Sequence, residues 1–130
     1  MDILREANAS LDCELETLFR KDSLDLTDAD RDAIAERVRA EPTPRILITH
    51  GTDTMVQTAL ALGAPAGKTV VLVGSLSPAR FKYSDAEFNI GFALGAPEAL
   101  PPGVYIAMNA RVFDPARVRK NREKNRFEEA

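Results

Sequence analysis

The stretch Arg45-Ile-Leu-Ile-Thr-His-Gly-Thr-Asp-Thr-Met55 decides how the rest of the chain is interpreted. Its apolar run at residues 46–48 predicts a buried strand, and Gly51 provides the tight turn that ends this strand. An amphipathic helix is expected from Met55 onward. A strand that passes through a tight turn into a helix is typical of an α/β protein.

The polar residues of this turn are predicted to occupy a ligand-binding position. Thr54, with Gln57 three residues later, fits a capping box that places the start of the helix near Thr54. Thr52 and Asp53 are then expected at the carboxyl end of a strand, beside the partly positive amino end of a helix. Open α/β sheets bind their ligands at that place. The alternative interpretation is that these residues merely cap the helix.

Strands and helices alternate along most of the chain. Helices are expected at residues 2–9, 27–41, 54–62 and 85–94, and strands at residues 11–19, 45–49, 69–73 and 104–108. The continuous apolar run at residues 69–73 is typical of a central parallel strand covered on both faces. No element is predicted in the charged tail, residues 117–130. This order predicts a single α/β domain over residues 1–130, a three-layer sandwich with a mainly parallel sheet of the Rossmann- or flavodoxin-like class, whose strand order stays open.

The composition of the 130 residues is that of a globular protein, with 45% hydrophobic and 28% charged residues. A net charge of −3 gives no reason to expect a nucleic-acid partner. No apolar run approaches the roughly 20 residues that span a bilayer, so no membrane segment is expected. Cys13 is the only cysteine and the first residues lack a secretory pattern, so the expected compartment is the cytoplasm. One cysteine and one histidine argue against a zinc site, and neither a metal nor another cofactor is expected.

The block from His50 to Met55, after its apolar strand, resembles the second signature of the bacterial-type asparaginases. Three further segments are similar to that family, at residues 71–78, 85–89 and 104–109. Within the first of them, Ser77 stands where the family has a basic residue. The resemblance covers roughly residues 20–125. It implies an amidohydrolase that releases ammonia from the side chain of asparagine and, in some members, of glutamine.

The resemblance places Lys120 at the family's catalytic lysine and implies catalytic roles for Thr52, Asp53 and Lys120. A carboxamide is poorly reactive, so the attacking oxygen must be activated and the developing oxyanion stabilised. Thr52 could supply the hydroxyl or position a water, and Asp53 could hold Lys120 by a charge-assisted hydrogen bond. A lysine kept dry can lose its proton and help to deprotonate a threonine. The alternative is that Lys120, in the basic run 117–126, belongs to a solvated surface.

The expected substrate-binding residues are Ser23, Gly51, Thr52, Asp53 and Ser75. Ser23 falls where the family has a segment that grips the substrate's α-carboxylate, and the family residue matching Asp53 also binds the α-amino group. Leu24 stands where the family has a glutamine that contacts the bound amino acid, which puts asparagine itself in doubt as the substrate. His50 is expected to be a structural residue, because the family chemistry does not use it as a base.

The family's first signature is a strand that ends in Thr-Gly-Gly-Thr-Ile, and its first threonine is the primary nucleophile. Nothing before Ser23 resembles that signature. We therefore expect a chain truncated at its amino end, with a natural variant that has lost the nucleophile as the alternative. Absence of the first strand would expose an apolar edge of the sheet, so the chain is expected to form a homo-oligomer or to be poorly stable.

The leading interpretation is an asparaginase-like amidohydrolase that converts L-asparagine into L-aspartate and ammonia and is truncated or impaired in this form. The second is a non-catalytic module that binds an amino acid or an acidic metabolite at the strand ends. A nucleotide-binding α/β domain is the third, and the absence of Gly-x-Gly-x-x-Gly and of Gly-x-x-x-x-Gly-Lys-Ser/Thr opposes it. A small-molecule substrate and a second copy of the chain are the expected partners.

Overall fold

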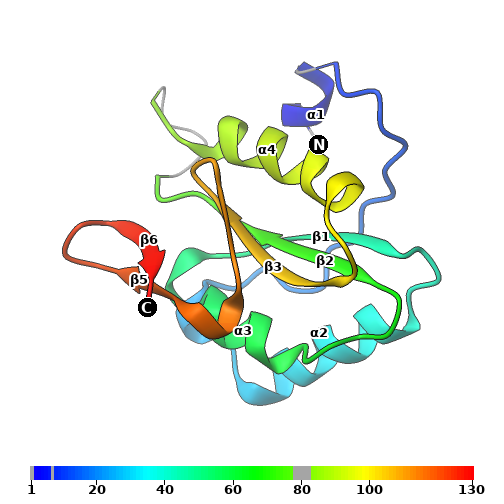
Figure 1. Cartoon of the computed structure of the whole chain (residues 1–130), viewed down its shortest axis with the longest axis horizontal. Helices are drawn as coiled ribbons and strands as arrows, with labels where there is room; N and C mark the ends of the chain where they lie inside the picture. The colour runs from blue at the N-terminus through cyan, green and yellow to red at the C-terminus, as the bar shows by residue number, and fades with distance from the viewer. Residues whose placement is uncertain (1, 7, 78–82) are drawn as a thin grey trace.

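The computed structural model describes residues 2–6, 8–77 and 83–130, which form a sheet covered by helices on both faces (Figure 1). Helix α4 lies on one face, and helices α2 and α3 lie on the other. The helices are α1 Asp2–Glu6, α2 Asp28–Ala40, α3 Met55–Ala61 and α4 Ala86–Ala99, with short 3-10 turns η1 Ser23–Asp25, η2 Thr52–Thr54 and η3 Pro115–Arg117. The strands are β1 Arg45–Thr49, β2 Thr69–Val73, β3 Gly103–Met108, β4 Arg111–Phe113, β5 Val118–Asn121 and β6 Arg126–Glu129.

The main sheet has the strand order β1-β2-β3-β4. Strands β1, β2 and β3 run parallel, and β4 pairs antiparallel with β3 at the far edge. All five residues of β2 are buried, because this strand is paired on both sides and covered on both faces. The predicted α/β fold with a mainly parallel sheet is therefore confirmed, and the structure supplies the strand order that the sequence left open.

Helix α2 follows the sequence prediction closely. Thr27 accepts a hydrogen bond from the Asp30 N–H at 3.1 Å, and the Asp30 carboxylate accepts one from the Thr27 N–H at 3.0 Å. This reciprocal capping box satisfies two backbone donors that the first helical turn leaves unpaired. The helix buries Ile34, Ala35 and Val38 in the core.

The predicted strand at residues 11–19 is wrong. The structure has no strand there, and most of the segment is exposed, including Leu11, Leu15 and Leu18. Phe19 packs against the core, and Glu16 pairs with Arg37 at 2.6 Å, so the segment is fixed at a few points only. Alternating hydrophobicity indicates a strand only where a neighbouring strand offers backbone partners. Among the described residues, no strand lies beside this segment to pair with its backbone.

Helix α4 extends beyond its predicted end, through Ala99 instead of Leu94. The sequence prediction stopped before Gly95 and Pro97, which are poor helix formers. Burial accounts for the difference, since Ala93, Ala96 and Pro97 lie on the face of the helix that packs on the sheet. Tertiary packing of this face therefore outweighs the low helix propensity of the two residues.

The charged tail, for which no element was predicted, contains the antiparallel hairpin of β5 and β6. Val118 and Phe127 are buried, and the Phe127 ring lies 6.5 Å from that of Phe113. On the exposed side, Glu128 accepts hydrogen bonds from Asn121, Arg119 and Arg126, which lower the pKa of its carboxyl to about 2. Two apolar residues thus anchor a hairpin whose other side chains are mostly polar. Each strand has only one buried apolar residue, so the sequence offers no alternating pattern from which to predict it.

Gly74 directly follows β2 and lies close to the backbone of His50, which directly follows β1. A Cβ atom at this position would overlap the His50 carbonyl oxygen and would lie 3.2 Å from Thr52 Cγ2. We therefore expect Gly74→Ala to destabilise the fold by about 3 kcal/mol, because backbone atoms would have to move. Gly91→Ala is the control, since a Cβ in this part of α4 meets nothing within 4 Å and should stabilise the helix by about 1 kcal/mol. Equal unfolding free energies of the two variants in urea would contradict the analysis.

Candidate active site

Three residues predicted to be catalytic lie together at the carboxyl end of the sheet. The Lys120 ammonium donates hydrogen bonds to Thr52 Oγ1 and to Asp53 Oδ1, each at 2.8 Å. Thr52 and Asp53 come from turn η2 after β1, whereas Lys120 comes from β5 of the hairpin. The fold therefore joins segments far apart in the sequence, and it places Lys120 inward instead of on the solvated surface that was the alternative.

The three side chains differ in their contact with solvent. Thr52 is buried at 8% exposure, the Lys120 side chain is 14% exposed, and that of Asp53 is 32% exposed. The hydrogen bond from Lys120 lowers the pKa of Asp53, as do the charges of Lys120 and Arg122, against the opposing effect of desolvation. Asp53 is therefore a carboxylate at neutral pH, which holds the lysine head group against the threonine hydroxyl.

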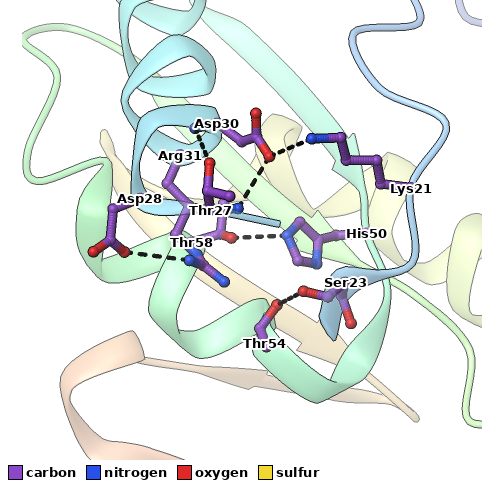
Figure 2. A network of polar contacts seen from close by, with 9 residues as sticks. All are labelled: Lys21, Ser23, Thr27, Asp28, Asp30, Arg31, His50, Thr54 and Thr58. Carbon is purple, nitrogen blue, oxygen red and sulfur yellow. Dashed lines mark hydrogen bonds and ion pairs between the residues drawn. The ribbon is translucent and has the colours of Figure 1, made fainter. Parts of the chain in front are cut away.

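The turn that carries Thr52 is tied to turn η1 by Ser23, as the lower part of Figure 2 shows. The Thr54 hydroxyl donates a hydrogen bond to the Ser23 carbonyl oxygen at 2.7 Å. Gly51 packs so closely on Ser23 that a Cβ at Gly51 would lie 2.8 Å from the Ser23 side chain. The predicted capping box of Thr54 and Gln57 is therefore wrong, since the Thr54 side chain makes no cap hydrogen bond and reaches the neighbouring turn instead.

His50 has both ring nitrogens engaged in the turn. Nδ1 lies 2.6 Å from the Gly51 carbonyl oxygen, which can only accept, so Nδ1 carries the proton. Nε2 then accepts the hydroxyl proton of Thr58 at 2.8 Å (Figure 2). Burial lowers the pKa of His50, and the nearby Arg31 charge adds to this, against the effect of the Gly51 hydrogen bond. The ring is a neutral structural element, and no free nitrogen remains to act as a base.

The ends of β2 and β3 are held by a second polar cluster around Asp85. Its carboxylate accepts hydrogen bonds from the Leu76 and Ser77 N–H groups at 3.0 and 3.1 Å. Asn89, which is fully buried, donates to Asp85 and to the Gly74 carbonyl oxygen, each at 2.9 Å. The side-chain oxygen of Asn89, Oδ1, accepts a hydrogen bond from the Asn109 backbone N–H at 3.0 Å. Residues 74–77, directly after β2, are thus held by Asp85 and Asn89 at the start of α4.

Ser23 and Ser75, which were also predicted to bind the substrate, lie in different surroundings. Ser23 is buried and packs against Gly51, directly before η2. Ser75 is half-buried in the loop after β2, next to Gly74. Its side chain makes no hydrogen bond to the Thr52, Asp53 and Lys120 group within the part of the chain that the structure describes. Pro78, the end of the segment that resembles the family loop, lies outside the described residues.

Arg122 is a site residue that sequence reasoning missed. Its guanidinium lies 3.6 Å from Asp53 Oδ1, the oxygen that Lys120 also contacts. The charged tail that contains Arg122 is only weakly periodic, and no element was predicted there. Arg122 directly follows β5, in the turn that leads to β6, so its position depends on a turn that the sequence prediction did not include.

The site offers a hydroxyl, a carboxylate and a lysine, which suits proton transfer and nucleophilic attack on an acyl group. Within residues 2–6, 8–77 and 83–130, no group of three histidine, cysteine or acidic side chains could hold a metal ion. Over the same residues, no helix combines the length and the apolar character that crossing a bilayer requires.

Comparison with known proteins agrees with this arrangement. The family described as Asparaginase, N-terminal, matches residues 2–128. L-asparaginase 2 of Bacillus subtilis (strain 168) is 40% identical over 72 residues, 52% of this chain and 19% of that protein. A probable periplasmic L-asparaginase of Haemophilus influenzae is 35% identical over 105 residues, 75% of this chain and 30% of that protein. The crystal structure of a probable cytoplasmic L-asparaginase from Campylobacter jejuni superposes with a TM-score of 0.82 at 30% identity, over 92% of this chain and 42% of that one. The chain thus spans less than half the length of these relatives.

The lowered pKa of His50 makes the stability of the fold depend on pH. Because the folded state favours the neutral ring, this stability is present above the ordinary pKa of 6.5 and is lost as pH falls through the folded-state value. We expect the unfolding free energy to fall between about pH 7 and about pH 5, and to fall less in His50→Asn. His50 is the only histidine in the sequence. The carboxylates with a lowered pKa change the unfolding free energy only at lower pH, where they become protonated. Parallel pH curves for both proteins would contradict the assignment.

Proposed function

The chain belongs to the asparaginase family, and from this premise we propose that it acts as an asparaginase-like amidohydrolase, which converts the side-chain carboxamide of L-asparagine into a carboxylate and ammonia. The observation that carries the proposal is the contact of Lys120 with both Thr52 and Asp53 at 2.8 Å. A capping turn needs no lysine, so helix capping alone does not account for this group.

Thr52 and Lys120 activate the attacking oxygen. This oxygen is the Thr52 hydroxyl or a water molecule that the hydroxyl orients. After the Lys120 ammonium has given up one proton, its amine takes up the proton of the attacking oxygen as that oxygen bonds to the amide carbon, and the ammonium so re-formed gives the proton to the departing nitrogen. Where Thr52 itself attacks, a water molecule then hydrolyses the ester, which releases the carboxylate and restores the hydroxyl. The short distance between Nζ and Oγ1 supports both transfers, because each needs hydrogen-bond contact.

Asp53 positions the lysine. The Asp53 carboxylate accepts a hydrogen bond from Lys120 Nζ, and its negative charge stabilises the ammonium that forms during attack. Ser23, Gly51 and Ser75, from the turns on either side of η2, are proposed to contribute to the substrate-binding wall with Thr52 and Asp53. The close packing of Gly51 on Ser23 supports this placement.

We further infer a cytoplasmic location and self-association. The single cysteine, Cys13, is exposed and unpaired, which suits a reducing compartment. Within the described residues, β1 pairs with β2 only, and its Ile46, Leu47 and Ile48 are half-buried. An apolar strand edge of this kind invites a second chain. Light scattering should therefore give a mass above the 14.2 kDa of one chain, and a sharp monomer would contradict self-association.

Replacing either member of the proton-transfer pair tests the proposed activity. We expect Thr52→Val and Lys120→Met each to lower the rate of ammonia release from L-asparagine about 10²-fold or more, because each removes a partner of the proton transfer. Lys124→Met is the matched control, since Lys124 is exposed in the hairpin turn and its replacement changes the net charge equally. Thermal melts would establish that all three variants fold.

Ammonia release that survives Thr52→Val would exclude a catalytic role for Thr52. If the unaltered protein released no ammonia but was thermally stabilised by L-aspartate, the non-catalytic binding module would be the correct interpretation instead.

A further inference from the structure

Asp53 is approached by two cations. Lys120 Nζ lies 2.8 Å and an Arg122 guanidinium nitrogen 3.6 Å from the same carboxylate oxygen, Oδ1. The Arg122 side chain is 64% exposed, whereas that of Lys120 is 14% exposed. Lys120 therefore forms the inner side of the group, and Arg122 lies on its solvent side.

The hairpin fixes Arg122 in this position. Asn121, the last residue of β5, accepts a hydrogen bond from the Lys124 N–H at 3.0 Å, which closes the turn. Asn125 adopts a left-handed conformation with φ of 48°, as the return into β6 requires. Lys120, from β5, and Arg122, from the turn that follows it, both reach Asp53.

The other arginines of the hairpin have different partners. Arg119 and Arg126 both bond Glu128, at 2.7 and 3.2 Å. In the part of the chain that the structure describes, the carboxylate in contact with Arg122 is Asp53, which Lys120 already engages. One carboxylate therefore faces two cations, and a positive charge is left in excess beside the Thr52 hydroxyl.

A ligand bound at Thr52 meets this excess charge. Beside Asp53, this positive charge favours an anionic group, leaves a neutral group unaffected and disfavours an ammonium. Two unit charges about 6 Å apart in water change an equilibrium constant by about threefold, and salt weakens the effect. An exposed arginine is expected to act within this range.

We propose that Arg122 is a specificity-determining residue, which biases the site toward dicarboxylic monoamides that carry no ammonium beside Asp53. Succinamic acid, which is asparagine without its α-amino group, represents this class of substrate. The inference rests on the proposed function, since it takes the ligand to be an amide or its acid product.

Calorimetric titration with two product-like probes tests the inference. Succinate and L-aspartate differ only in the α-ammonium group. We expect the ratio of the Kd for L-aspartate to the Kd for succinate to fall about threefold in Arg122→Gln. Arg119→Gln is the matched control, because it removes the same charge from the same hairpin on the side that faces Glu128. In that variant the ratio should stay unchanged.

Salt provides a measurement that needs no variant. In 1 M NaCl the ratio for the unaltered protein should fall toward that of Arg122→Gln, because the exposed charge is screened. A ratio that is insensitive to both Arg122→Gln and salt would overturn the inference, as would an equal fall in Arg119→Gln. Failure of both probes to bind would overturn it too.

Ammonia release separates this inference from the proposed function. If succinate binds in preference to L-aspartate as expected but neither succinamic acid nor L-asparagine yields ammonia, the proposed hydrolysis fails and the role of Arg122 remains. If ammonia is released but Arg122→Gln leaves the preference for succinamic acid over L-asparagine unchanged, the hydrolysis stands and the role of Arg122 fails.

Discussion

The ion pair of Lys120 with Asp53, shared with the Thr52 hydroxyl, is the interaction on which the rest of the structure depends for its chemistry. Neither segment could make the site alone. The turn after β1 supplies a hydroxyl and a carboxylate, and the hairpin supplies the cation. A partly buried ion pair of this kind stabilises the fold only when both charges are held in good geometry, because each charge has lost some of its hydration. The apolar anchors Val118 and Phe127 provide that geometry by seating the hairpin on the core.

Two polar clusters hold the turns at the carboxyl end of the sheet in place. Ser23, Gly51 and Thr54 join the turn η2 to the turn η1, so the backbone of Thr52 is fixed from one side. Asp85 and Asn89 hold residues 74–77, directly after β2, by hydrogen bonds. The bonds from the Leu76 and Ser77 N–H groups to Asp85, for example, satisfy backbone donors that lie beyond the end of β2. Preorganisation of this kind reduces the cost of orienting reacting groups.

The sequence predicted those parts of the fold whose signals are local. The apolar run at residues 69–73 identified the central strand, and Thr27 with Asp30 identified the start of α2. Sequence patterns whose meaning depends on a neighbouring strand were unreliable: they predicted one strand that is absent and missed a hairpin that is present. Residues 11–19 alternate as a strand does but have no strand beside them among the described residues. The charged hairpin, in contrast, is held because Phe127 packs in the core near Phe113. The same dependence concealed Arg122, since its role follows from where the hairpin lies and not from its neighbours in the chain.

The central claim is that Thr52 and Lys120 act as one proton-transfer unit in amide hydrolysis. A double-mutant cycle on kcat/KM for ammonia release from L-asparagine, with Thr52→Val, Lys120→Met and the combined variant, measures this coupling most directly. If the two residues act as one unit, the combined variant will be no slower than the slower single variant. Losses that multiply in the combined variant would mean that the two side chains contribute independently, and they would contradict the account.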